Sequence, residues 1–452
     1  MLTIELEENK VNWKLISPKK FTHSLRGLKR MYFGINRLKG RSPRGLAELL
    51  FLWVSISTLP ILTASSNDSL KYHITSVGME TFFMANSNSI GESSFAIMQL
   101  GGYIDANHKR EIIKRLKNVN RIGLDFYGNI RLNTFTKNNK NHYIELGAAS
   151  NLNTSFSKNL VELALYGNGR FAGEKVELGN VNYRSISWLK AGYGFVKVIG
   201  RNYFETNVNL IVGLRETHFI AKDLNIFTQD AGEFLDVNAN IQFNRSKPYP
   251  NPLIKLSGFG LGLDATWKYF GSKYQHQVWL TDLGGIIWTA NPQQFRFDSS
   301  FVFNGVDIPN IAAVAERNFV SNLHDSVKNE FTKRIKNEDY LSFLPAIFRY
   351  KLSGAFANDD RLAVQFTIRP NANFAPRILI EYSKVLRKNR GAFVSRIGLG
   401  GYGDYDLDIG YSLKKNNNVF SIYLLGVESV IVPKYNAGVG IYIGYNQTIG
   451  KR

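Results

Sequence analysis

The side chains best able to carry chemistry in this chain are seven histidines and a short row of aspartates. The histidines lie far apart and lack the close spacing, as in HExxH, that places two metal ligands on one helix face. They are His23, His73, His108, His142, His218, His276 and His324. The chain has no cysteine, which excludes disulfides and thiolate ligands. We therefore predict no metal site built on these residues.

The aspartates Asp404, Asp406 and Asp408 alternate along one stretch and resemble a calcium cluster at first sight. On a strand, alternate residues are about 6.6–7 Å apart, which is too wide for ligands of one ion without help from loops. We expect lumen or turn residues here, with calcium as the alternative.

Two glycine-rich stretches, GFGLGLD and GLGGYGD, could suggest phosphate loops. Neither is followed by a helix, so neither matches a nucleotide-binding turn. No Ser-His-Asp set can be assigned from spacing. We assign no catalytic residue, no cofactor and no metal, and we do not expect an enzyme.

The elements that position these residues are long alternating strands. In Gly258–Trp288 the large apolar groups of the first half all fall on odd positions, with glycine and polar residues between them. An ordinary strand has about 5–6 residues, whereas a strand of about 9–11 crosses a bilayer within a barrel. We predict a lipid-facing row on this strand: Phe259, Leu261, Leu263, Trp267 and Tyr269.

The same alternation recurs through the chain, and Leu235–Phe243 is one example. We count about fifteen candidate strands between Ile74 and Gln447, joined by Asn, Lys and Gly turns. The rings of Trp188, Trp267 and Trp288 are expected near strand ends, as at a membrane interface. The pattern predicts an all-β, antiparallel transmembrane barrel of about 14 strands, within roughly 12–16. A periplasmic or surface β-sandwich is the alternative.

Two segments have helical rather than strand periodicity. Gly101–Asn118 carries a partial apolar stripe of Ile112, Ile113 and Leu116. Asp307–Asp339 is a stronger amphipathic pattern, with Pro309 near its start. We predict a helical insert over 307–339 that packs against the rim or lumen wall and narrows the pore. A helix that lies in the membrane interface is the alternative. Its apolar band is Ala315, Phe319, Leu323, Val327, Phe331 and Ile335.

The N-terminal region has the order of an export signal. A basic stretch precedes the apolar run Leu46–Leu62, and Thr63–Ser66 supplies small residues. We predict an N-terminal extension with a cleaved export signal over 1–64, followed by the barrel over 65–452. An uncleaved membrane anchor is the alternative.

The formal net charge is +20, but the basic residues are scattered singly along the strands and turns. A nucleic-acid-binding protein would cluster them with stacking aromatic residues, so we expect no nucleic-acid partner. A basic lumen or rim, or attraction to anionic lipid, explains the charge at least as well.

The chain resembles a family of predicted outer-membrane β-barrels of unknown function from Bacteroidota. The resemblance is carried by GFGLGLDATWKYF, VWLTDLGGIIW and FVFNGVDI within Gly258–Gly305, with weaker support from GGYIDANHKREI, NTSFSKNLVELALYGNGRFAG and GVGIYIGYN. It extends from about Val77 to Gly450 and implies the fold and an outer-membrane location, but no reaction.

Three functions are compatible with this reading. The first is a porin-like conduit or binding barrel that transports or holds a small solute. The second is a non-transport structural or accessory subunit of a secretion or surface-attachment complex, and the third is a membrane-embedded enzyme. The expected partners are outer-membrane lipid and, for the second function, an outer-membrane or periplasmic protein.

Overall fold

The computed structural model describes residues 2–7, 10–15, 72–91, 94, 104–136, 141–230, 235–247, 256–303, 334–356, 360–386, 391–431 and 437–449. The chain divides into two compact units, Met1–Ala64 and Ser65–Arg452. In the first unit, strands β1 (Leu2–Glu7) and β2 (Lys10–Leu15) form an antiparallel pair.

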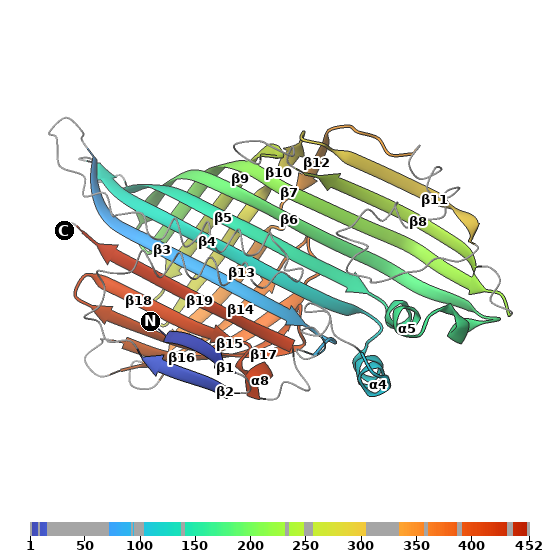
Figure 1. Ribbon diagram of the computed structural model, residues 1–452. Helices are drawn as coiled ribbons and strands as arrows, with labels where there is room; N and C mark the ends of the chain where they lie inside the picture. Colours follow the sequence, from blue (N-terminus) through green and yellow to red (C-terminus); the bar gives the residue numbers. More distant parts are fainter. Residues whose placement is uncertain are drawn as a thin grey trace. The chain divides into compact units, whose positions relative to one another are not determined.

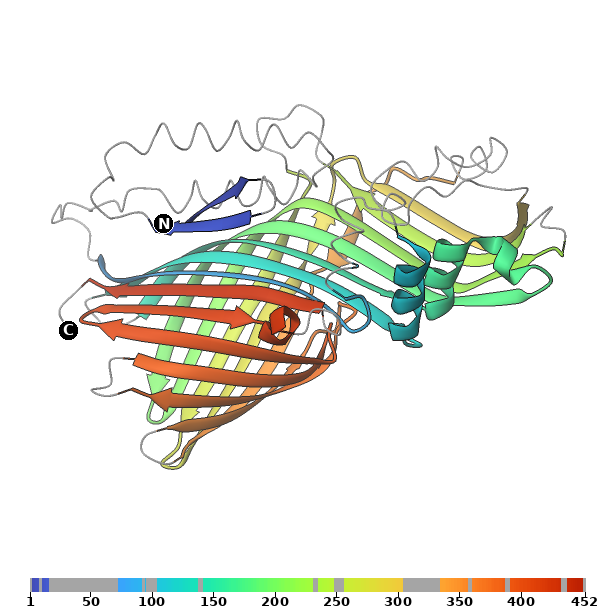
Figure 2. The ribbon, with the colours of Figure 1, turned by 60° about the horizontal axis from the view of Figure 1, so that its bottom comes forward.

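The described part of the second unit forms a closed antiparallel barrel of fourteen strands, as the alternation predicted. Neighbours in sequence pair with one another, and β19 pairs with β3 to close the ring (Figures 1 and 2). The barrel strands are β3 (Tyr72–Ser87), β4 (Asn120–Thr136), β5 (Asn141–Phe156), β6 (Lys175–Ile199), β7 (Asn202–Thr228), β9 (Gly258–Phe270), β10 (Tyr274–Trp288), β13 (Ile347–Ala355), β14 (Arg361–Ile368), β15 (Ala375–Val385), β16 (Gly391–Gly401), β17 (Tyr405–Lys415), β18 (Asn418–Leu425) and β19 (Ala437–Thr448).

The outer face of this barrel is apolar. Large apolar side chains at one parity are exposed on most strands, among them Leu146, Val208, Val364, Ile380 and Ile397. Closure leaves no open edge, so every wall strand can pair its backbone N–H and C=O groups, which a hydrocarbon environment requires. Among the described residues, no helix is long and apolar enough to cross a membrane.

Strands β6 and β7 are longer than the wall needs, at 25 and 27 residues. The first part of β7 pairs with β9 inside the wall, whereas residues 216–228 pair with β8 (Leu235–Ser246). β8 pairs in turn with β11 (Gln293–Phe303). These strands form an extension sheet, β6–β7–β8–β11, that leaves the ring of the barrel (Figure 1).

The extension sheet corrects the expectation that Leu235–Phe243 is a wall strand. Its alternation is as predicted, but its apolar side chains are buried in a cluster with side chains of β7 and β11. The buried residues are Ala221, Val237, Ala239, Ile241, Phe295 and Phe297. Alternation identifies a face, and it does not say what covers that face.

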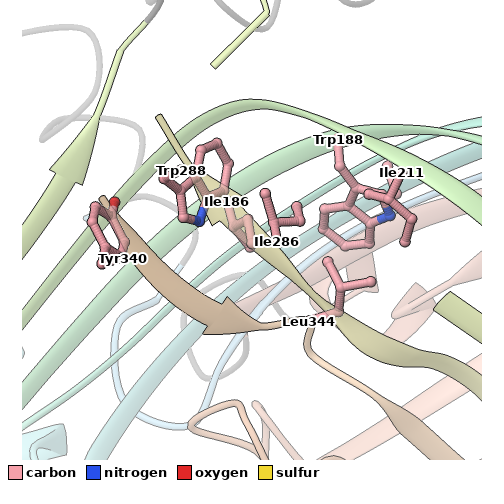
Figure 3. Close-up of a cluster of buried hydrophobic side chains, with 8 residues drawn as sticks. Ile186, Trp188, Ile211, Ile286, Trp288, Tyr340 and Leu344 are labelled. Carbon is pink, nitrogen blue, oxygen red and sulfur yellow. The ribbon is translucent and has the colours of Figure 1, made fainter. Parts of the chain in front are cut away.

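Strand β10 changes partner along its length. Residues 274–281 pair with β13, and residues 285–288 pair with the short strand β12 (Tyr340–Phe343). At this change an apolar cluster packs on the inner face of the wall (Figure 3). The cluster contains Ala149, Ile186, Trp188, Ile211, Ile286, Trp288, Tyr340 and Leu344.

This inner cluster corrects the interface role expected for two tryptophans, although Trp288 is the last residue of β10 and so lies at a strand end as expected. Trp188 lies in the middle of β6 and is 3% exposed, and Trp288 is fully buried, with its Nε1 donating to Ser342 Oγ at 2.7 Å. Their rings therefore fill the interior and do not form a membrane-interface girdle.

The barrel has two different ends. At one end, which we call the short-turn end, the chain reverses within residues 200–201, 271–273 and 416–417. At the other, the helical end, residues 88–119 and 157–174 make long connections that contain α4 (Ala106–Arg115) and α5 (Lys158–Tyr166). The 3-10 helix η2 (Asn168–Phe171) and α8 (Val427–Ile431) also lie at this end.

Helix α4 confirms the helical pattern predicted in Gly101–Asn118. Asp105 caps its start, with Oδ1 accepting from the backbone N–H of His108 at 2.8 Å. Its Ile112 and Leu116 pack against Ile90 and against Val161 of α5. This small core fixes both helices to the helical end.

Candidate functional site: a polar lumen closed at one end

The inner face of the barrel is identified by ion pairs that skip over neighbouring strands. Lys190 on β6 reaches Asp282 on β10, although β7 and β9 lie between them. Only side chains on the concave side of a curved wall can meet in this way. The charged residues that alternate with the apolar outer row therefore face the lumen.

Lys190 is the centre of the largest ionic group. Its Nζ lies 3.3 Å from Glu145, 3.4 Å from Asp264 and 3.8 Å from Asp282, and its side chain is 9% exposed. Asn209 also donates to Asp264 at 2.8 Å. Since an unpaired buried charge costs several kcal/mol, these groups stabilise one another only as a set.

A second group lines the lumen closer to the short-turn end. Glu205 on β7 accepts from Arg131 at 2.6 Å, from Tyr143 at 3.0 Å and from Tyr203 at 2.5 Å. The Arg131 guanidinium stacks over the Tyr143 ring, 3.5 Å from its centroid. Arg131 comes from β4, so this contact also spans several strands.

At the helical end, the turn between β14 and β15 folds inward across the barrel. Asn373 Nδ2 donates to Asn153 Oδ1 of β5 at 2.8 Å and to the carbonyl of Asn182 at 3.1 Å, and Ser155 donates to Asn373 Oδ1 at 3.1 Å. In the fourteen-strand ring, β5 lies half-way around from β15. The turn is thus fixed to the opposite wall.

A second inward contact comes from the turn between β16 and β17. Tyr402 accepts at its hydroxyl from Asn151 of β5 at 3.0 Å and from Arg369 at 3.3 Å, while Arg369 pairs with Asp125 of β4 at 2.5 Å. Gly123 has no side chain at the point where the Tyr402 ring passes, and a Cβ there would overlap the ring. We call residues 369–374 and 402–404 the inward turns.

Together with the inner apolar cluster, the inward turns fill the lumen at the helical end. The apolar cluster occupies the side of β5, β6, β7 and β10, and the turns bring polar groups from the opposite side. The arrangement can hold a solute inside the barrel or block its passage, and movement of the turns would open the end.

The predicted lipid-facing row lies on β9 at one parity. Phe259 and Leu261 are 57% and 63% exposed, and Leu263, Trp267 and Tyr269 are half-buried. The intervening Asp264 faces the lumen. Contact of this row with lipid remains a prediction.

The predicted aspartate row is divided among basic partners. Asp404 pairs with Lys117, and Asp406 and Asp408 both lie beside Arg377, with Asp408 at 3.7 Å. Among the described residues, no group of three or more acidic or histidine side chains is arranged to hold a metal ion.

The predicted helical insert lies almost wholly outside the described residues, including Ala315, Phe319, Leu323, Val327 and Phe331. The last residue of its band, Ile335, is described and packs against the buried cluster of the extension sheet. The prediction is wrong for this end of the insert, because residues 334–339 are not helical and Lys336 forms an antiparallel bridge with Gln294.

The sequence pattern did not single out the residues that form the lumen network, among them Lys190, Arg369 and Asn373. Only for Lys190 does a glycine on the neighbouring strand, Gly147, leave space that the side chain uses.

Comparison with known proteins gives one family and a fold likeness. The family described as "Family of unknown function (DUF5723)" matches residues 62–402. No curated protein sequence matches the chain.

Similar solved structures have low sequence identity to the chain and TM-scores below 0.5. A deltaS2S3 mutant of TodX from P. putida, titled a monoaromatic hydrocarbon channel, has 7% identity and a TM-score of 0.41, and the match covers 83% of this chain and 91% of that chain. A FadL homologue of Pseudomonas aeruginosa has 8% identity and a TM-score of 0.39, covering 82% and 89%. A porin mutant of Rh. blastica has 8% identity and a TM-score of 0.25, covering 83% and 100%.

Proposed function

From the premise that the chain belongs to this family of unknown function, we propose that it is an outer-membrane barrel that conducts or binds a small solute. The observation that carries the proposal is a closed barrel whose polar lumen is blocked at one end by turns fixed with hydrogen bonds. A barrel with a purely structural role would not need turns that close its lumen.

The outer-membrane location is supported by the apolar outer face and by the two unequal ends. Barrels of this kind have short periplasmic turns and longer extracellular connections. The short-turn end, where β3 begins and β19 ends, would then face the periplasm. The helical end and the inward turns would face the outside.

Part of the closure depends on neutral side-chain hydrogen bonds that a substitution can remove. The side chains of Asn371 and Asn373 make four hydrogen bonds to Leu344, Asn153, Asn182 and Ser155. Each contributes about 0.5–1.5 kcal/mol, so their loss shifts the closed–open balance by an order of magnitude or more.

The test compares currents through the purified protein in planar bilayers. We expect rare or small openings from the unmodified protein and more frequent openings from Asn371→Ala/Asn373→Ala. Asn107→Ala, on the exposed surface of α4, is the matched control and should behave like the unmodified protein. A double variant that folds but opens no more often than the unmodified protein would contradict closure by the inward turns.

The extension sheet favours a second candidate function, an accessory subunit of a larger outer-membrane assembly. Its strands continue past the ring of the barrel and are not needed to close it. A stoichiometric partner in detergent extracts, lost when β8 and β11 are altered but not when the inward turns are, would favour this function over conduction.

A further inference from the structure

One arginine inside the lumen lacks the partner that its neighbours have. Arg349 lies on β13 at the same parity as Lys351, which pairs with Glu381 two strands away at 2.8 Å and therefore faces the lumen. In the described part of the chain, Arg349 forms no hydrogen bond or ion pair. Its side chain is only half-buried, and the exposed part of the side chain must face the space inside the barrel.

The register of three adjacent strands places two more basic groups around it. Arg349 is opposite Thr367 on β14, and Thr367 is opposite Arg377 on β15. Arg369 follows Thr367 by two residues, at the same parity. Neighbouring strands are about 4.7–4.9 Å apart, so the three guanidinium groups surround one point on the inner wall.

The two neighbouring arginines are already paired, and Arg349 is not. Arg369 is held by Asp125, and Arg377 by Asp406 and Asp408. Both still keep a buried Nε without a hydrogen-bond partner. The Arg369 side chain is only 7% exposed, so water has little access to its Nε.

Two carboxylates, Glu80 on β3 and Asp282 on β10, lie within electrostatic reach of Arg349, but neither forms an ion pair with it. Glu80 and Tyr127 are within electrostatic reach of Arg349, from strands on the far side of the ring. Glu80 accepts from Asn129 and from Tyr442, each at 3.2 Å, and Asp282 lies 3.8 Å from Lys190, so both carboxylates have other partners. An unpaired cation in such a lumen is costly unless an anion joins it.

Building on the proposed function, we propose that Arg349, with Thr367 beside it, binds the carboxylate of a small organic anion within the lumen. The guanidinium offers two parallel N–H donors to a planar carboxylate. Thr367 Oγ1 accepts from Gln365 Nε2 at 3.2 Å, which leaves its hydroxyl hydrogen to donate to the anion. Arg369 and Arg377 add positive potential and the unpartnered Nε groups.

The experiment measures binding by calorimetry on the detergent-purified full chain, with butyrate and inorganic phosphate as separate probes. We expect saturable binding of butyrate, weakened at least about tenfold in Arg349→Gln, since a charge-assisted pair is lost. Arg296→Gln, on the exposed part of β11, is the matched control and should bind as the unmodified protein does. Binding of phosphate but not butyrate would overturn the assignment to a carboxylate.

A second variant keeps the test decisive if Arg349→Gln does not give a heat-modifiable barrel. Arg349→Lys retains the charge but loses the two parallel N–H donors of the guanidinium. We expect this variant to fold and to bind butyrate several-fold more weakly. No saturable binding to the unmodified protein, or equal weakening in the Arg296→Gln control, would refute the site. The binding experiment does not depend on current. An absence of channel currents in planar bilayers would therefore refute conduction and leave the binding result unaffected.

Discussion

At the scale of single residues, the interior is stabilised by charges that meet across strands. Arg184 on β6 donates to Glu216 on β7 at 2.8 and 3.1 Å, and the two side chains are 6% and 0% exposed. Arg184 Nη1 also donates to the carbonyl of Asn371, at 3.3 Å. One guanidinium therefore joins the wall to an inward turn.

Removing Arg184 should leave Glu216 buried and unpaired. We expect Arg184→Met to lower the free energy of unfolding by about 3–5 kcal/mol, because an uncompensated buried charge remains. Arg184→Met/Glu216→Gln should recover part of the loss. The measurement is a urea titration in lipid vesicles, followed by tryptophan fluorescence.

Arg170→Met is the control for this prediction. Arg170 is exposed and lies 4.0 Å from Glu162, so its removal should cost about 0–1 kcal/mol. If the double variant were less stable than Arg184→Met, the unpaired carboxylate would not be the cause of the loss.

At the scale of elements, the two parities of each strand serve two environments. Val208 on β7 lies opposite Leu263 on β9, in the middle of the stretch where these strands pair, and is 56% exposed. The neighbouring Asn207 and Asn209 are buried toward the lumen. One strand thus carries both an exposed apolar row and part of the polar network.

A charge on the outer parity should interfere with assembly in a membrane. We expect Val208→Arg to cost about 2–4 kcal/mol if Val208 lies near the bilayer midplane. Val119→Arg is the matched control, since Val119 is similarly exposed, at 51%, but lies in a connection at the helical end. The readout is the heat-modifiable fraction in the membrane, and equal assembly of both variants would argue against lipid on the outer parity.

At the scale of the whole molecule, the chain divides at Ala64–Ser65 into two units. The order of basic, apolar and small residues before this point predicts export and cleavage. N-terminal sequencing of the membrane-extracted protein should begin near Ser65–Asn67. Retention of Leu46–Leu62 in the mature protein would favour an anchor.

The sequence by itself determined the strands, their faces and the class of fold. Alternation with a period of two is a local property, so GFGLGLDATWKYF reveals its outer row wherever the strand is placed. The strands' length and number then led to a closed barrel of about fourteen strands. The apolar stripe of α4 was also readable, because helical periodicity is a local property, whereas its partners Ile90 and Val161 were not.

Tertiary structure decided which strands close the ring and what each inner side chain meets. Alternation did not place β8 and β11 outside the ring, because an apolar row has the same sequence pattern whether lipid or protein covers it. Nor did it predict that Trp188 and Trp288 pack inside, or that Arg369 meets Asp125 across the lumen. Partners so far apart in sequence are chosen by the curvature and register of the closed wall, which no local pattern contains.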